Sequence, residues 1–420
     1  MRWIVLLLVA STAIACSSDV APTPGGLGEG CPGAPALAEL SAPPAFAVVL
    51  SDFSSTAIAI LDANGQVLND RWLDSGTRPP GLVAALSGDV VFPSTGVDGS
   101  LLVIDRFRTD VVSRFCLQDG SIVGQLRTHG EAVTGGFSSN PQDLLALDNT
   151  AWVSRYESNL QSGVDAINRG NDLFELDLRT MTHTGRTVDL TSLNGRAMNP
   201  AGENLSALAR PVRLVRTASG IAVGLDRLSP AFDAAGEGAL ALVDPDAQVV
   251  SSVTLPGFQN CGQIVPAQDG RVLVACAGFA SDFCDAGARS QTAGLVIVDP
   301  ATESIEQEWR ASGTSIPTVE PLVLPDGSVL AGAAGACDGT SPDRLVRVDL
   351  NSGAETVIYE GSGSFTLGRT VWQDNRVLLP DSEAGVVAFT WTGTDLENQE
   401  RIVSTDAFLL PPRQIGVLSP

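Results

Sequence analysis

The chain has 420 residues and carries 48 acidic against 25 basic side chains, a formal net charge of −23. Every basic residue is an arginine, and so acidic a surface disfavours binding to nucleic acid and to anionic membranes. A hydrophobic content of 44% excludes a disordered chain, and 43 glycines with 25 prolines suit many strands joined by turns. Length allows either two or three average domains or one large β domain.

The N-terminus has the layout of an export signal. Arg2 precedes an apolar run over 3–10 that is too short to stay in a membrane as a spanning helix, and small residues follow it. The segment Ala13-Ile14-Ala15-Cys16 resembles the lipobox of bacterial lipoproteins, in which cleavage leaves a lipidated cysteine. This resemblance implies an exported chain anchored in the membrane of the cell envelope by lipid on Cys16, and Ser17 fits sorting to the outer membrane. The alternative is ordinary signal cleavage that leaves Cys16 unmodified.

Residues 16–45 are rich in Pro, Gly, Ala and Ser and contain few large apolar residues. This composition predicts a flexible tether. The expected organisation is therefore a signal peptide over 1–15, a lipid-anchored tether over 16–45 and a folded part over 46–420.

A short apolar run closed by an aspartate and followed by a turn recurs through the folded part. The pattern predicts a buried strand that enters a tight hairpin. The clearest copy is 294–300, and the looser copies are 59–62, 102–105, 174–177, 241–244 and 346–349.

Each repeat divides into four strands, and the run described above is predicted to be the third. Short turns rich in Gly, Asn and Asp join the first strand to the second, the earliest of them at 86–89. The fourth strand is more polar, as an outer edge exposed to water should be. Six such quartets are predicted over 80–127, 141–190, 209–255, 258–310, 317–360 and 366–405.

The two ends of the folded part complement one another. Residues 46–50, 56–62 and 67–73 look like second, third and fourth strands, and 411–418 looks like a spare first strand. Joining them makes a seventh blade and closes the ring, which removes exposed sheet edges. We predict an all-β, seven-bladed β-propeller closed by its C-terminal strand. Six or eight blades are the alternatives, because 110–125 could hold an extra strand.

The phrase Leu-Val-Ile-Val-Asp-Pro-Ala-Thr at 295–302 resembles the repeats of seven-bladed propellers of the YVTN and NHL type. The resemblance covers most of 46–418 and implies the same architecture. Such repeats occur in enzymes, binding proteins and structural proteins alike, so it implies no particular activity.

In a propeller, the connections from second to third strands and those between blades lie on one face. Several are long here, whereas every turn on the opposite face is predicted to be short. Long loops favour a binding face over the third to sixth blades, although surface insertions also drift at little cost. The long connections are 155–171, 227–238, 277–293, 333–343, 128–140 and 191–210. Aromatic residues in or beside them that could stack on a peptide or glycan are Tyr156, Phe232, Phe279 and Phe283.

Seven cysteines leave six for disulfides once Cys16 carries lipid, an even number that suits an exported protein. One predicted pair flanks a turn symmetrically, so its members face each other on adjacent strands. A second joins equivalent loops of adjacent blades, and a third fastens the tether. These pairs are Cys261–Cys276, Cys284–Cys337 and Cys31–Cys116.

Catalytic motifs are mostly missing. His129 and His183 are the two histidines, and neither has a cysteine or carboxylate at zinc spacing. No nucleophile elbow, phosphate-binding loop or dinucleotide fingerprint occurs. Oxygen-bearing residues crowd two of the long loops and suit calcium, the one cofactor left open, although they match no fixed spacing and solvated turns explain them as well. These weak calcium candidates are Asp165, Asn168, Asp172, Asp282 and Asp285.

We therefore expect a lipid-anchored, non-catalytic propeller of the bacterial cell envelope that binds a protein, peptide or glycan with its loop-rich face. The first alternative is a calcium-dependent hydrolase or lactonase with its site in the central channel. Near the starts of first strands, Asn140, Asn260 and Glu320 would supply its ligands. The second alternative is a purely structural envelope protein.

Overall fold

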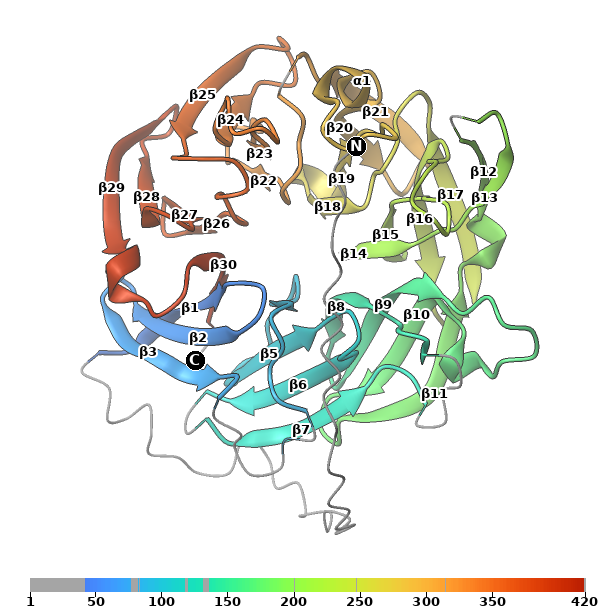
Figure 1. Ribbon diagram of the computed structural model, residues 1–420, viewed down its shortest axis with the longest axis horizontal. Helices are drawn as coiled ribbons and strands as arrows, with labels where there is room; N and C mark the ends of the chain where they lie inside the picture. The colour runs from blue at the N-terminus through green and yellow to red at the C-terminus, as the bar shows by residue number, and fades with distance from the viewer. Residues whose placement is uncertain are drawn as a thin grey trace, which may run out of the picture.

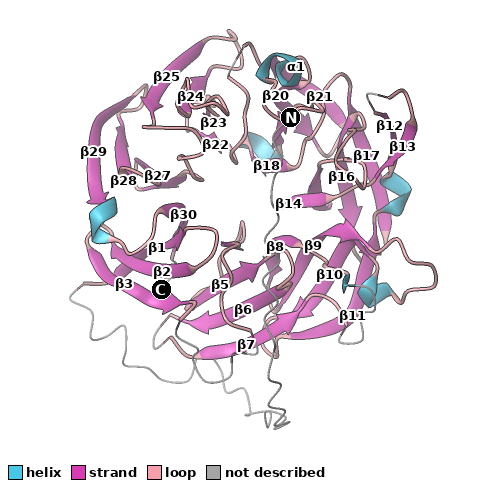
Figure 2. Cartoon of the chain, in the orientation of Figure 1, coloured by secondary structure: helices cyan, strands magenta, loops and turns pink. Residues whose placement is uncertain are grey.

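The computed structural model describes residues 42–76, 82, 84–117, 120–130, 136–199, 201–246, 248–313 and 315–418. Within them the chain forms a ring of seven four-stranded sheets (Figure 1). Strands dominate this ring and its helices are short (Figure 2). The predicted seven-bladed β-propeller is thereby confirmed.

Six blades are continuous in sequence, and in each the strands pair in chain order. Their strands are β4 (Val90–Val91), β5 (Ser100–Asp105), β6 (Val111–Cys116) and β7 (Ile122–Arg127); β8 (Pro141–Leu147), β9 (Thr150–Ser158), β10 (Gly170–Asp177) and β11 (Thr182–Asp189); β14 (Pro211–Thr217), β15 (Gly220–Leu225), β16 (Gly238–Asp244) and β17 (Val249–Leu255); β18 (Gln263–Pro266), β19 (Val272–Ala277), β20 (Ala293–Asp299) and β21 (Ser304–Arg310); β22 (Leu322–Val323), β23 (Val329–Ala333), β24 (Arg344–Val348) and β25 (Glu355–Glu360); β26 (Val371–Gln373), β27 (Arg376–Asp381), β28 (Gly385–Trp391) and β29 (Leu396–Ser404).

The seventh blade joins the two ends of the chain. β30 (Pro412–Val417) pairs with β1 (Pro44–Ser51), which continues into β2 (Thr56–Asp62) and β3 (Val67–Asp74). The antiparallel register places Phe46 opposite Val417, and Figure 1 shows the red C-terminal strand beside the blue N-terminal one. The predicted closure is confirmed, and it covers a strand edge that β1 would otherwise expose.

The blade over 90–127 differs from its prediction. Residues 86–89 precede the blade, and its first strand is only two residues long. The run 102–105 therefore lies in the second strand, β5, and the third strand is β6 within 110–125. The extra strand completes this blade and adds no eighth one. The connection between β4 and β5 spans 92–99, so the prediction that every such turn is short was wrong at this position.

Burial follows strand position. β20 is buried along nearly its whole length, whereas most residues of β21 face solvent. The apolar core lies between neighbouring blades: one cluster joins Leu240 of β16 to Val274 of β19. Trp152 is buried in β9. Because the core lies between the sheets, the connections at the two ends of the ring can vary without disturbing it.

Candidate functional site

The two ends of the ring differ in their connections. We call loop face the end formed by the connections from second to third strands and by those between blades, and turn face the opposite end. The loop face carries most of the additional structure. It holds the helix α1 (Ala286–Ser290), the hairpin of β12 (Gly195–Met198) and β13 (Asn204–Ala207), and 3-10 turns at Ala166–Asn168, Thr191–Leu193 and Thr405–Ala407.

Buried carboxylates hold these loops in place. Asp343 accepts hydrogen bonds from the backbone N–H groups of Gly335, Phe365 and Thr366, at 2.7, 2.9 and 2.7 Å. It thereby ties the loop before β24 to the connection before β26. Asp110 does the same elsewhere, accepting from Ser138 Oγ at 2.9 Å. A carboxylate that accepts several N–H groups acts as a rigid linker, because each bond to a charged acceptor is stronger than a neutral one.

Two disulfides add covalent links near the loop face. Cys261 is bonded to Cys276 and Cys284 to Cys337, the pairings that the sequence predicted. The second bond crosses from the β19–β20 loop to the β23–β24 loop. The third predicted pair cannot be placed in this way, because Cys31 lies outside the described residues; Cys116 is buried in β6 and is not a free thiol.

Exposed apolar side chains gather on the loop face. Ten large hydrophobic residues are exposed among those described, and two of them, Val357 and Val417, lie in the blade strands β25 and β30. The other eight all lie in loop-face connections: Phe53, Phe107, Leu160, Met198, Phe232, Phe283, Phe365 and Leu409. Scattered exposed hydrophobics need no explanation, but such bias to one end of the ring does.

Three of these phenylalanines form what we call the aromatic arc. Phe283 stacks on Phe365 with ring centroids 6.3 Å apart, and the two are 54% and 51% exposed. Arg413 donates to the carbonyl of Phe365 at 3.1 Å and places its guanidinium 4.5 Å from the ring centre of Phe53, which is 71% exposed. On the other side, Arg289 lies 4.3 Å from the ring centre of Phe283. Arginines that pack against the rings fix the rings while their outer surfaces stay free.

A second cluster stands over the blades of β8–β11 and β14–β17. The buried guanidinium of Arg210 lies between two rings, 4.8 Å from the centre of Tyr156 and 4.1 Å from that of Phe232. Arg210 also pairs with Glu157 at 2.8 Å. Tyr156 is buried, and its hydroxyl donates to Asp226 at 3.0 Å. Contrary to our expectation, its ring is not exposed on the loop face and instead supports it from below. Phe279 is half-buried, which leaves Phe232 and Phe283 as the exposed members of the predicted aromatic set.

Backbone conformation marks the same residues. Phe53, Phe232 and Phe365 have φ values of 66°, 61° and 61°. Bulky residues rarely adopt positive φ, because their Cβ then crowds the backbone, and such residues cluster at functional sites. Nothing in the sequence pattern indicated these φ values, and Phe53 and Phe365 were missed because their connections were not among those predicted to be long.

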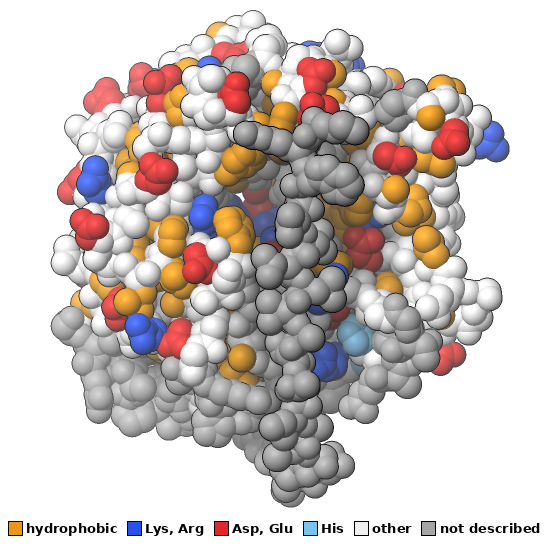
Figure 3. All heavy atoms as spheres, in the orientation of Figure 1, with side chains coloured by type: hydrophobic (Ala, Val, Ile, Leu, Met, Phe, Trp, Pro, Cys, Tyr) orange, Lys and Arg blue, Asp and Glu red, His pale blue; other side chains and the backbone are white. Residues whose placement is uncertain are grey.

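The calcium candidates do not come together as a ligand set. Asp172 directs both oxygens at Arg155, at 2.7 and 2.6 Å. Asp282 and Asp285 accept from backbone N–H groups of their own turn, Asn168 accepts from Gly130 N, and Asp165 is exposed. No cluster of three or more His, Cys, Asp or Glu side chains in the described part of the chain could hold a metal ion. On the face drawn in Figure 3, acidic side chains lie dispersed around the ring among uncharged ones.

The centre of the ring contains an ion-pair network that sequence reasoning found only in part. Arg213 Nε lies 2.8 Å from Glu320, and Arg369 Nη2 lies 2.9 Å from the other oxygen of the same carboxylate. Asp143 accepts from Ser94 Oγ at 2.6 Å and pairs with Arg213 at 3.4 Å. Glu320 was singled out as a calcium ligand, but two arginines already neutralise it. The two arginine partners were missed because Arg213 and Arg369 are far from Glu320 in the sequence.

Asn140 and Asn260, the other residues considered for a channel metal, make local bonds. Asn140 Oδ1 accepts from Gln142 Nε2 at 2.7 Å, and Asn260 Nδ2 donates to the carbonyl of Gly278 at 3.4 Å. No helix in the described ranges is long and apolar enough to span a membrane.

No protein-family model matches the chain, and no curated protein matches it either. Solved structures share its fold. A protein from Lactobacillus plantarum is 14% identical over 89% of this chain and 99% of its own length, with a TM-score of 0.53. Dihydro-heme d1 dehydrogenase NirN, solved in complex with DHE, is 15% identical over 93% of this chain and 78% of its own, with a TM-score of 0.50. Likeness at this identity shows the propeller fold alone, and function must be argued from the site.

Proposed function

We propose that this chain is an exported β-propeller that binds a protein, peptide or glycan with its loop face and catalyses no reaction. The observation that carries the proposal is that, among the described residues, eight of ten exposed large hydrophobics lie in loop-face connections. Exposed apolar groups that are rimmed by polar residues mark interaction sites in soluble proteins.

The aromatic arc is the centre of the proposed interface. Its rings are held by Arg289 and Arg413, and its loops are joined by the Cys284–Cys337 disulfide and by Asp343. Rings that are fixed before binding lose little conformational entropy on association. Aromatic residues in such positions dominate binding energies at interfaces.

Export and anchoring form the second part of the proposal. Disulfides persist in oxidising compartments, and two of them lie in the described part of the chain. Cys16 lies outside the described residues, as do the signal and nearly all of the tether. Mass spectrometry of the N-terminal peptide from the membrane fraction tests the anchor, with diacylated Cys16 as the expected result. An N-terminus at Cys16 without acyl chains would contradict it.

Site-specific photocrosslinking in intact cells tests the binding face. We expect a photoreactive residue at position 283 or 365 to capture a discrete partner, and one at exposed Asn351 on the turn face to capture none of it. The captured partner, once purified, should bind the chain directly, and Phe283→Ser/Phe365→Ser should weaken that binding at least tenfold.

The control is Val357→Ser, which changes an exposed apolar residue inside the outer strand β25. Equal capture at positions 283 and 351, or direct binding that the double variant leaves unchanged, would refute the proposal. These substitutions are preferable to deletion of the whole loop over 277–293, because that deletion also removes Cys284 and the buried Arg289.

A further inference from the structure

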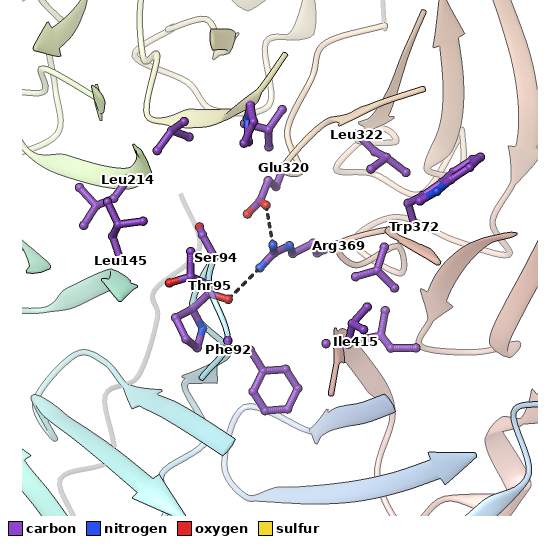
Figure 4. A pocket seen from close by; sticks show the side chains of 18 of the residues that line it. Phe92, Ser94, Thr95, Leu145, Leu214, Glu320, Leu322, Arg369, Trp372 and Ile415 are labelled. Atoms are coloured by element: carbon purple, nitrogen blue, oxygen red, sulfur yellow. Dashed lines mark hydrogen bonds and ion pairs between the residues drawn. The ribbon is translucent and has the colours of Figure 1, made fainter. Parts of the chain in front are cut away.

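A cavity of 580 Å³ occupies the centre of the ring on the side of the turn face. It is lined by the far ends of the inner strands and by residues 92–97 of the β4–β5 connection. Figure 4 shows Glu320 and Arg369 paired near its middle. This volume is in the range of sites for small organic ligands.

The walls of the cavity are largely apolar. Aliphatic and aromatic side chains face it from separate blades, and in Figure 4 they surround the central charged pair. Those that define the walls are Phe92, Leu145, Leu214, Leu322, Trp372 and Ile415. Val417 adds an exposed apolar residue to the lining. A ligand body that is removed from water by these walls gains free energy in proportion to its apolar area.

The charge of the lining is opposite to that of the protein as a whole. Three charged residues line the cavity, Arg216, Glu320 and Arg369. Glu320 is already paired with Arg213 beneath it as well as with Arg369. In a chain with 48 acidic and 25 basic side chains, a lining of two arginines and one doubly paired glutamate is a local excess of positive charge. It favours an anionic ligand group.

Arg369 is placed to meet such a group. Its Nη2 holds Glu320 at 2.9 Å, whereas its Nη1 reaches the carbonyl of Pro93 only at 3.4 Å. A guanidinium has five N–H donors in a planar fork that matches a carboxylate. Loss of the weak bond to Pro93 would free one edge of that fork at little cost.

We propose that this cavity binds a small amphipathic carboxylate, with its carboxylate on Arg369 and its apolar chain or ring against Leu322, Trp372 and Val417. The site faces away from the loop face, so it is independent of the function proposed above. The network of Asp143, Arg213 and Glu320 forms its floor.

Calorimetric titration of the purified full chain, with Cys16→Ser so that no detergent is needed, tests the site. Decanoate is the probe, and decanol and decyltrimethylammonium are matched uncharged and cationic compounds. We expect saturable one-to-one binding of decanoate, and at least tenfold weaker binding of the other two. Absence of saturable decanoate binding, or equal affinity for decanol, would overturn the proposal.

Two variants locate the site. Arg369→Gln should weaken decanoate binding at least tenfold, and Glu320 then keeps Arg213 as its partner. Leu322→Trp should block binding by filling the cavity, and it tests the location even if Arg369→Gln fails to fold. The control is Arg271→Gln, an exposed arginine that pairs with Glu306 outside the cavity. Decanoate affinity that is unchanged by both cavity variants, or equally reduced by the control, would place the ligand elsewhere.

Discussion

The two ends of the ring use the same residue types in opposite ways. On the loop face, phenylalanine rings are exposed, while arginine–carboxylate pairs such as Arg155–Asp172 are buried beneath the loops. On the turn face, apolar side chains turn inward around a cavity, and pairs such as Arg271–Glu306 lie exposed at the rim. Burial makes an ion pair a rigid support that is costly to break, whereas exposure leaves it a weak contact. The loop face therefore presents rings to solvent, and the turn face encloses a cavity.

We expect the largest loss of stability from breaking the buried ion pair between Arg155 and Asp172. Asp172→Asn leaves the guanidinium of Arg155 in the interior without its counter-charge and should lower the free energy of unfolding by about 3–5 kcal/mol. Urea denaturation measures the change. Arg169→Gln, in the exposed pair with Asp189, is the control and should cost no more than about 1 kcal/mol. Equal losses would erase the distinction between the two kinds of pair.

Removal of the Cys284–Cys337 disulfide, which joins two loops, should have the second-largest effect on stability. Cys284→Ala/Cys337→Ala removes a link between residues 53 apart in sequence, and a cross-link of this kind contributes about 2–4 kcal/mol by restricting the unfolded chain. We expect a loss in that range in denaturant titrations, together with weaker capture of a partner at position 283. Unchanged stability would mean that Asp343 and the strand pairing alone hold these loops.

A pH-dependent effect distinguishes Asp226 from surface carboxylates. Burial raises its pKa from 3.8 to about 6, with the hydrogen bond from Tyr156 and the charge of Arg210 opposing the rise. The folded chain therefore holds this proton more tightly than the unfolded chain. The ionised group costs stability above pH 6, the cost falls between pH 6 and 4, and it vanishes below that. Relative to the parent, Asp226→Asn should gain about 3 kcal/mol in unfolding free energy between pH 4 and pH 7.5. Parallel stability curves would refute the assignment.

The smallest effect on stability should come from the residues proposed to matter most for binding. Phe283→Ser/Phe365→Ser removes exposed rings, so the free energy of unfolding should change by no more than about 0.5 kcal/mol per residue. Thermal and urea denaturation check this. A loss of several kcal/mol would show that the stack of the two rings is a structural element, and the aromatic arc would then lose its argument as a binding surface.

Much of the fold follows from local pattern. The run over 294–300 is buried and its aspartate begins a turn, as predicted. Such features can be predicted because a strand and the turn after it depend on only a few neighbouring residues. The pairing of Cys261 with Cys276 followed from symmetry about one hairpin. The prediction for the blade over 90–127 was wrong because β4 is only two residues long. So short a strand shows no recognisable pattern of apolar residues.

The candidate sites were harder to predict, because they are assembled across blades. Phe283 was found because its loop was predicted to be long, but Phe365, which stacks on it, is 82 positions away (365 − 283) in a connection outside that prediction. Tyr156 was predicted to be exposed, but its ring packs against Arg210 and its hydroxyl donates to Asp226. The sequence by itself determined the blades, their closure and two disulfides, since these depend on periodicity and turn chemistry. Only the tertiary structure decided which rings are exposed and which charges meet in the centre, because seven inner strands converge there from distant parts of the chain.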